Sequence, residues 1–211
     1  MQILSHRGYW KYLDEKNTQA AFQRAFTLSF GTETDIRDYQ GKLVISHDIA
    51  NEKCLELSSF FEIYKEYGDL PLALNIKADG LQIKLQELLS KYEIKNYFVF
   101  DMSIPEEIVY IRDNFNIFTR ESEYESTPLF YEQAKGVWLD EFENHWINES
   151  TIQKHLAHNK KICIVSPDLH KREYIPVWHD YKKIITNINS SDVMLCTDFP
   201  EEARRFFDVH N

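Results

Sequence analysis

Histidines and charged side chains recur directly after short apolar runs of this sequence. His6 and Arg7 follow the run 2–5, and His47 follows the run 43–46. A histidine titrates near neutral pH, so two of them suit a pair in which one takes a proton and the other gives it. For either histidine alone, the alternative is an ordinary structural role.

Two acidic residues stand close together in a stretch that is predicted to be a strand. Glu33 and Asp35 are two positions apart in the run 32–36, so their side chains face the same way. Paired carboxylates repel each other unless a cation or a proton lies between them. Oxygen ligands of this kind favour a hard divalent cation, Mg²⁺ or Ca²⁺. The alternative is a pair of exposed carboxylates on an edge strand.

Positive charge is expected near these groups. Arg7 offers a planar fork of donors and Lys77 offers a point charge, and both suit a phosphate oxygen. The alternative is that they form salt bridges to Glu33 or Asp35. At the ends of the later strands, Asp101, Asp140 and Glu141 are candidates for a metal or for substrate hydroxyls, and His170 for a substrate contact. The remaining histidines are expected on the surface or in loops: His145, His155, His158, His179 and His210.

The elements that must position these residues form a repeating pattern. Short apolar runs alternate with amphipathic stretches about eight times, for example strand 32–36 after a helix that begins at an Asn17 cap. Repeated strand–helix units predict a parallel sheet covered by helices. Eight repeats without a glycine-rich dinucleotide turn favour an α/β TIM (β/α)8 barrel, whose chemistry lies at the carboxyl ends of its strands. With no linker visible, residues 1–211 are predicted to form a single barrel domain.

Composition narrows the class of protein. The 211 residues carry 24 Lys plus Arg and 34 Asp plus Glu, a formal net charge of −10 that argues against nucleic acid as the main partner. The sequence has no run of 18 apolar residues, so no membrane span is predicted, and the N-terminus lacks the pattern of a secretory signal. The three scattered cysteines suit a reducing compartment. We therefore expect a cytoplasmic protein.

Three separated segments carry a resemblance to a known family. SHRGYW, NTQAAFQRAFTLSFGTETDI and GKLVISHD resemble the N-terminal motifs of the glycerophosphodiester phosphodiesterase family in order and spacing through about residue 48. Further along, LALNIK and LCTDFPEEA resemble its third and eighth strand segments. The family is a TIM barrel, which agrees with the repeat pattern.

The resemblance implies an activity and a site. It implies a metal-dependent hydrolase of lipid metabolism that cleaves a small phosphodiester to an alcohol and a phosphomonoester. In this likeness, His6 and His47 are the acid–base pair and Arg7 and Lys77 contact the phosphate. The implied metal ligands are Glu33, Asp35 and, more weakly, Asn75.

The sequence departs from the family pattern in three places. The usual Glu-Ile-Lys is Asn75-Ile76-Lys77 here, which removes one negative charge and predicts weaker metal binding. The acid of the Glu-Asn-Thr motif is Lys16, and the Arg-Thr-x-Gly segment after His47-Asp48 is missing. Two alternatives therefore stand beside the hydrolase: a weakly active or non-catalytic barrel that binds a phosphorylated ligand, and a related lyase that forms a cyclic phosphate.

Overall fold

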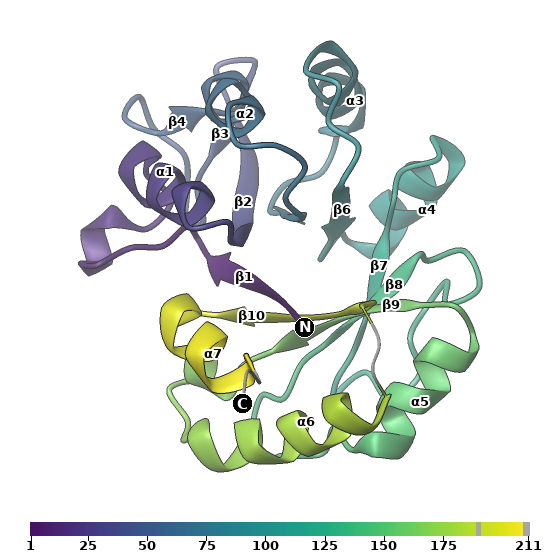
Figure 1. Cartoon of the computed structure of the whole chain (residues 1–211). Coiled ribbons are helices and arrows are strands. Elements are labelled where there is room, and N and C mark those ends of the chain that lie inside the picture. The colour runs from purple at the N-terminus through teal and green to yellow at the C-terminus, as the bar shows by residue number, and fades with distance from the viewer. Residues whose placement is uncertain (189–190, 209–211) are drawn as a thin grey trace. The chain divides into compact units, whose positions relative to one another are not determined.

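The computed structural model of the protein describes residues 1–188 and 191–208, and it divides into two compact units. The N-terminal unit is Leu4–Ile117, and the C-terminal unit is Met1–Ile3 with Phe118–Asn211. Strands and helices alternate along the chain in both units (Figure 1). The prediction of a single domain over residues 1–211 stays a prediction.

Four parallel strands form the frame of the N-terminal unit, in the spatial order β1, β2, β5, β6. Their bounds are Gln2–His6, Gly31–Tyr39, Leu72–Ile76 and Tyr97–Phe100. The second half of β2 continues beyond its parallel partners and pairs antiparallel with β3 (Lys42–Ile45), which in turn pairs with β4 (Leu55–Glu56). The second half of β2 and β3 thus form a hairpin that extends beyond the parallel strands, and β4 pairs with its outer strand.

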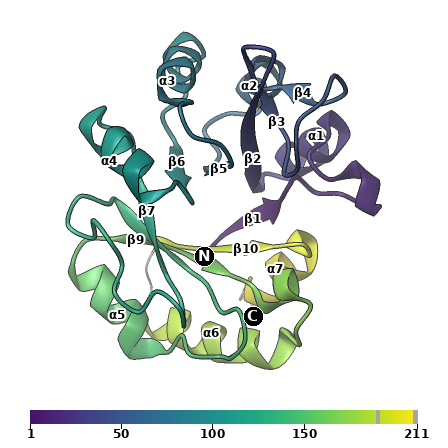
Figure 2. The same ribbon diagram turned by 180° about the vertical axis from the view of Figure 1, so that it is seen from behind.

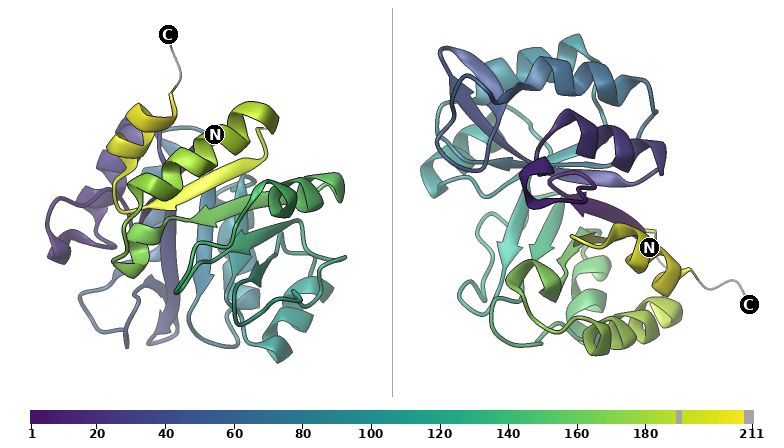
Figure 3. Two further views of the ribbon diagram at one scale, coloured as in Figure 1. Left: turned by 90° about the horizontal axis from the view of Figure 1, so that it is seen from below. Right: turned by 90° about the vertical axis from the view of Figure 1, so that its left-hand side faces the viewer.

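The helices of this unit lie on one face of its sheet (Figure 3). They are α1 (Gln19–Thr27), α2 (Leu57–Lys65), α3 (Gln82–Lys91) and α4 (Ile104–Arg112), with a short 3-10 turn at Leu13–Glu15. An aromatic cluster joins α1 to α2: Phe22 and Phe60 meet edge to face with ring centroids 4.6 Å apart, and Phe26 packs beside both. All three rings are buried, so this apolar cluster fixes the helices against the strands.

The start of α1 differs from the prediction. Thr18, rather than Asn17, is the N-cap, and its hydroxyl accepts the backbone N–H of Ala21. Asn17 has φ +61°, a left-handed conformation that asparagine tolerates better than most residues, and its side chain is directed away from the helix. Its amide instead binds Thr34 and Asp35 on β2.

Four further parallel strands form the C-terminal unit, in the order β7, β8, β9, β10. Their bounds are Phe118–Glu121, Gly136–Leu139, Lys161–Val165 and Val193–Thr197. Helices α5 (Glu149–Ala157), α6 (Ile175–Ile188) and α7 (Pro200–Phe207) cover one face of this sheet (Figure 2), and a 3-10 turn follows β9 at Pro167–His170. Trp178 of α6 is fully buried, and its indole N–H donates to the Ser166 hydroxyl at 2.9 Å.

One histidine departs from its expected place, since His155 on α5 is fully buried and not in a loop or on the surface. It lies between the Tyr131 hydroxyl, 2.9 Å from Nδ1, and the Glu121 carboxylate, 3.2 Å from Nε2, and this polar neighbourhood allows its burial. His210 lies outside the described residues. No helix in the described ranges is long and apolar enough to cross a membrane, and the cytoplasmic location stays a prediction.

A close approach at Gly8 yields a stability prediction. Gly8 has φ +79°, and an added Cβ would come within 2.8 Å of the Ala21 Cβ. Gly68 also has positive φ, at +95°, but nothing lies within 4 Å of its added Cβ. Gly68→Ala should therefore cost about 1–2 kcal/mol of unfolding free energy, from backbone strain alone. Gly8→Ala should cost about 1–3 kcal/mol more, from the added clash. Urea unfolding of both variants measures the difference, and equal losses would show that the contact between the first loop and α1 is loose.

Candidate active site

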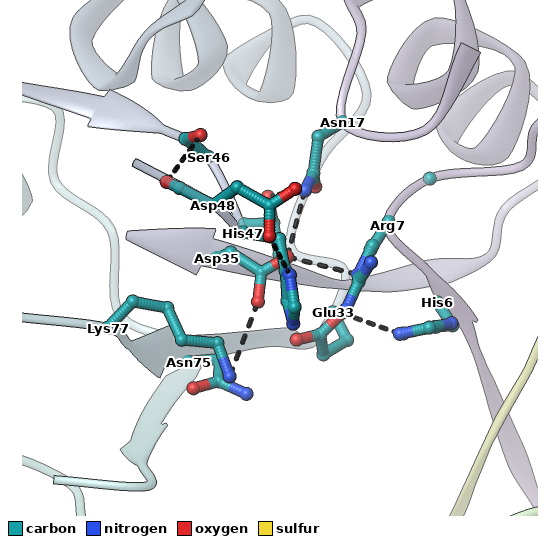
Figure 4. A network of polar contacts seen from close by, with 12 residues as sticks. His6, Arg7, Asn17, Glu33, Asp35, Ser46, His47, Asp48, Asn75 and Lys77 are labelled. Atoms are coloured by element: carbon teal, nitrogen blue, oxygen red, sulfur yellow. Dashed lines mark hydrogen bonds and ion pairs between the residues drawn. The ribbon is translucent and has the colours of Figure 1, made fainter. Parts of the chain in front are cut away.

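The predicted site residues lie in the N-terminal unit, on neighbouring strands or just beyond their ends. His6 ends β1 and pairs in register with Glu33 on β2, and Asp35 pairs with Asn75 on β5. Lys77 directly follows β5. Arg7 and His47 follow β1 and β3. Figure 4 shows the side chains of these residues converging on one region. The structure therefore brings together all seven residues that the sequence predicted.

Asp35 is the most heavily contacted of these side chains, and it is fully buried. Its Oδ2 accepts a hydrogen bond of 2.8 Å from Asn17 and lies 3.1 Å from Nε of Arg7, and its Oδ1 lies 3.7 Å from Nζ of Lys77. The salt bridges that were the alternative for Arg7 and Lys77 are thus present. About a fifth of each cationic side chain stays exposed, which leaves both able to meet a ligand oxygen.

Glu33 occupies a different environment two residues away. Its side chain is buried, and its Oε2 lies 3.9 Å from Nε2 of His6. Burial raises the pKa of Glu33 well above its ordinary value of 4.5, and the charge of Asp35 raises it further. Arg7 and Lys77 offset part of this rise. The fully exposed edge-strand alternative for the two acids is therefore wrong.

Asp101, which follows β6, holds the far side of the site. Its Oδ2 accepts a hydrogen bond of 3.1 Å from the Asn75 side-chain amide and lies 3.8 Å from Nζ of Lys77. Because the amide nitrogen of Asn75 is engaged by Asp101, its carbonyl oxygen is the group left for another partner. From the sequence, Asp101 is a candidate for a metal or for substrate hydroxyls. The structure shows instead that it contacts two other members of the site.

Three buried oxygens of this site lack a hydrogen-bond donor among the described residues: Glu33 Oε2, Asp35 Oδ1 and Asn75 Oδ1. Buried acceptors without a partner are costly, and a hard divalent cation is a partner that such oxygens suit. Within the described ranges, no group of three or more His, Cys, Asp or Glu side chains is arranged to hold a metal ion. In chemistry, two carboxylates and one amide oxygen are ligands of the kind that a divalent cation takes, with one negative charge fewer than three acids would supply.

The two histidines differ in exposure. His6 is largely covered, whereas 45% of the His47 side chain is exposed. Nδ1 of His47 lies 2.9 Å from a carboxylate oxygen of Asp48, and this hydrogen bond lowers the pKa of Asp48. Because a carboxylate only accepts, Nδ1 carries the proton and Nε2 is the basic nitrogen of the neutral His47 ring. Arg37 anchors the segment by donating to the His47 backbone carbonyl.

The weaker candidates of the later strands lie in the C-terminal unit. Nε2 of His170 is 2.6 Å from the Asp140 carboxylate, and the ring also packs against Phe142. Glu141 is fully buried and accepts hydrogen bonds from the backbone N–H groups of Trp146 and Ile147. The carboxylate of Glu141 therefore serves to shape a loop, as a capping acid does.

Comparison with known proteins supports the fold. No protein-family model matches the chain, and no curated protein matches it in sequence. Among solved structures, it resembles a glycerophosphodiester phosphodiesterase from Parabacteroides distasonis ATCC 8503, with TM-score 0.68 and 14% identity over 98% of this chain and 96% of that one. It also resembles a glycerophosphodiester phosphodiesterase from Agrobacterium tumefaciens str. C58, with TM-score 0.66 and 15% identity over 98% of both chains.

A third structural neighbour carries a different chemistry. The phosphoribosyl anthranilate isomerase from Thermus thermophilus matches with TM-score 0.52 and 10% identity over 98% of this chain and 96% of that one. The predicted TIM-barrel fold class and the resemblance to glycerophosphodiester phosphodiesterase structures are confirmed. At these identities the likeness shows the fold alone, so activity must be argued from the site.

The environment of Glu33 predicts how stability depends on pH when divalent cations are removed. Below the ordinary pKa of glutamate, the group is protonated in both the folded and the unfolded chain. As pH rises above that value the unfolded chain releases the proton first, so the contribution of Glu33 to the free energy of unfolding falls until pH exceeds the folded pKa. Glu33→Gln should remove this fall and stabilise the cation-free protein at neutral pH by about 1–4 kcal/mol.

Urea unfolding in the presence of a chelator, at pH values from about 4 to 8, measures this effect. This range covers the ordinary titration of carboxylates and histidines. Glu87→Gln, which changes an exposed glutamate of α3, is the matched control and should leave the pH profile unchanged. A Glu33→Gln variant that is less stable than the parent at neutral pH would contradict the assigned environment.

Proposed function

We propose that this protein is a metal-dependent phosphodiester hydrolase that cleaves a small phosphodiester to an alcohol and a phosphomonoester. The observation that carries the proposal is the meeting of two histidines, two cations and three buried oxygens that lack a hydrogen-bond donor among the described residues, all in one site of the N-terminal unit. The fold likeness to two glycerophosphodiester phosphodiesterases supports the same reading. The proposed metal is Mg²⁺ or Ca²⁺, held by Glu33, Asp35 and Asn75.

Hydrolysis needs charge neutralisation at phosphorus and two proton transfers. Arg7 and Lys77 contact the phosphate oxygens through their exposed portions and offset the charge that develops there. A bound divalent cation would add Lewis-acid polarisation of the phosphodiester. The water oxygen forms a bond to phosphorus as the bond to the alkoxide breaks. The imidazoles of His6 and His47 divide the proton transfers, one accepting the proton of water and the other protonating the alkoxide.

A second candidate function follows from Asn75. An amide at this position leaves the three proposed metal ligands with only two formal negative charges, and a site that captures its cation weakly would bind a phosphorylated ligand without efficient turnover. Arg7 and Lys77 would serve such a binding role unchanged. Turnover with saturating metal separates the two functions, because the hydrolase cleaves the diester under these conditions and the binding protein does not.

The first experiment measures hydrolysis of bis(p-nitrophenyl) phosphate and of glycerophosphodiesters with added Mg²⁺, Ca²⁺ or Mn²⁺. His47→Ala should lower kcat/KM by roughly 10²–10⁴-fold, the usual contribution of one acid–base group. Since nearly half of the His47 side chain is exposed, thermal unfolding should change little. His158→Ala, an exposed histidine of the C-terminal unit, is the control and should keep full activity.

The product distinguishes the reaction type. A phosphomonoester supports the hydrolase, and a cyclic phosphate would identify the lyase alternative instead. Full activity of His47→Ala would remove His47 from the acid–base pair, and no turnover by folded protein with any metal would favour the binding function.

A separate experiment tests Asn75 through binding rather than activity. Asn75→Glu adds a third carboxylate to the set and should tighten divalent-cation binding by roughly tenfold or more. The same change places a carboxylate near Asp35 and Asp101, so it should lower the stability of the cation-free protein. Calorimetric titration with Mg²⁺, Ca²⁺ and Mn²⁺ measures the affinity. Gln86→Glu, on the exposed side of α3, makes the same change in net charge and should leave the cation affinity unchanged. Equal affinity of Asn75→Glu and the parent would exclude position 75 as a ligand.

A further inference from the structure

A pocket of about 560 Å³ borders the candidate site within the N-terminal unit. Its wall comes from two segments, the loop between β1 and α1 and the loop between β3 and β4 with the adjoining residues, and it includes Arg7 and His47. Figure 4 shows these two side chains within the candidate site. The volume falls within the range of small-molecule sites. A ligand that contacts Arg7 and His47 with its phosphate therefore has room for a further group beside them.

The pocket wall holds more basic than acidic side chains. Besides Arg7, whose charge faces Asp35, the wall holds Lys16 and Lys53. Asp48 is the only acidic residue among the described residues that line it, and its carboxylate already pairs with His47. Two lysines thus give this surface a positive charge in a protein whose formal net charge is −10.

The local structure positions one of these lysines and adds to the positive electrostatic potential of the pocket. Nζ of Lys16 lies 4.4 Å from the centroid of the Trp10 ring, a cation–π contact that helps to position the ammonium. Thr18 and Gln19, the N-cap and the first residue of α1, line the same pocket. The positive end of the α1 dipole therefore acts in the same direction as the lysines. Leu13 and Leu55 supply an apolar part of the wall.

We propose that this pocket receives the alcohol portion of the phosphodiester, and that this alcohol bears an anionic group, a carboxylate or a second phosphate, which Lys16 and Lys53 bind. The carbon chain between the two anionic groups would lie along the apolar part of the wall. This inference rests on the proposed function and names the substrate class of the same site. A diester with a cationic alcohol would meet like charge in the pocket and be disfavoured.

The test uses three methyl alkyl phosphodiesters that differ only at the far end of the second alcohol: pentyl, 4-carboxybutyl and 5-aminopentyl. Phosphorus NMR measures kcat and KM for formation of the phosphomonoester. The carboxybutyl diester should exceed the pentyl diester in kcat/KM by about threefold to tenfold, the effect of one or two partly exposed ion pairs. The difference should lie mainly in KM, and the aminopentyl diester should be the poorest substrate.

Paired variants identify the residues responsible. The double variant Lys16→Met and Lys53→Met should bring the ratio of carboxybutyl to pentyl kcat/KM close to one. The control is Lys65→Met with Lys91→Met, which removes the same charge from α2 and α3. It is closely matched because Lys91 also lies over an aromatic ring, that of Tyr92 at 5.0 Å. This control should keep the parent ratio.

The outcomes separate the two levels of the proposal. Turnover of all three diesters without a preference for the carboxylate would overturn the pocket assignment and leave the hydrolase intact. If neither these diesters nor bis(p-nitrophenyl) phosphate and the glycerophosphodiesters are turned over, the hydrolase is overturned, and calorimetry with the monoesters 5-phosphooxypentanoate and pentyl phosphate tests the pocket directly. Tighter binding of the carboxylate by the parent, lost in the Lys16 and Lys53 double variant, would support the pocket; equal binding would refute it.

Discussion

The candidate site depends on how one buried carboxylate is satisfied. Asp35 is fully buried, and a charge removed from water is tolerated only when other polar groups surround it. Here those groups are Arg7, Asn17 and Lys77, which lie directly after β1, directly before the N-cap of α1 and directly after β5. The carboxylate therefore holds three separate segments of the chain against β2. Removing it would take from Arg7 and Lys77 the counter-charge that they share, leaving Lys77 with Asp101, and would release the loops that carry them.

Glu33 and Asp35 show that position and environment are set by different parts of the sequence. Strand geometry places both acids on one side of β2, but only Asp35 is contacted by cations and by a side-chain amide donor. Glu33 keeps a buried oxygen without a donor among the described residues, and burial raises its pKa. The two acids consequently differ in their surroundings: Asp35 organises the cationic side chains, and Glu33 keeps a buried oxygen that no described residue hydrogen-bonds.

Local pattern predicted the members of the site better than their contacts. The two-residue period of β2 and the strand-end positions of His6 and Lys77 follow from short stretches of sequence, and the structure agrees with them. The bond from Asn17 to Asp35 spans 18 residues, and that from Asn75 to Asp101 spans 26, so no local rule reveals either. Asn17 looked like a helix cap because a cap and a buried hydrogen-bond donor call for the same kind of residue. The prediction for His155 was wrong because its partners, Tyr131 and Glu121, are distant in sequence and become its neighbours only on folding.

The fold leaves the chemistry open, because two phosphodiesterases and an isomerase all match the chain over almost its whole length. The choice rests on charge at a few positions. Relative to the pattern that the sequence resembles, Asn75 replaces an acid beside the proposed metal, and Lys16 replaces an acid at the wall of the adjoining pocket. Both replacements make the surroundings of Arg7 and Lys77 more positive. A more positive site binds a divalent cation less tightly and an anionic ligand more tightly. Weaker metal capture and a preference for anionic diesters are therefore expected to accompany each other, as two consequences of one shift in local charge.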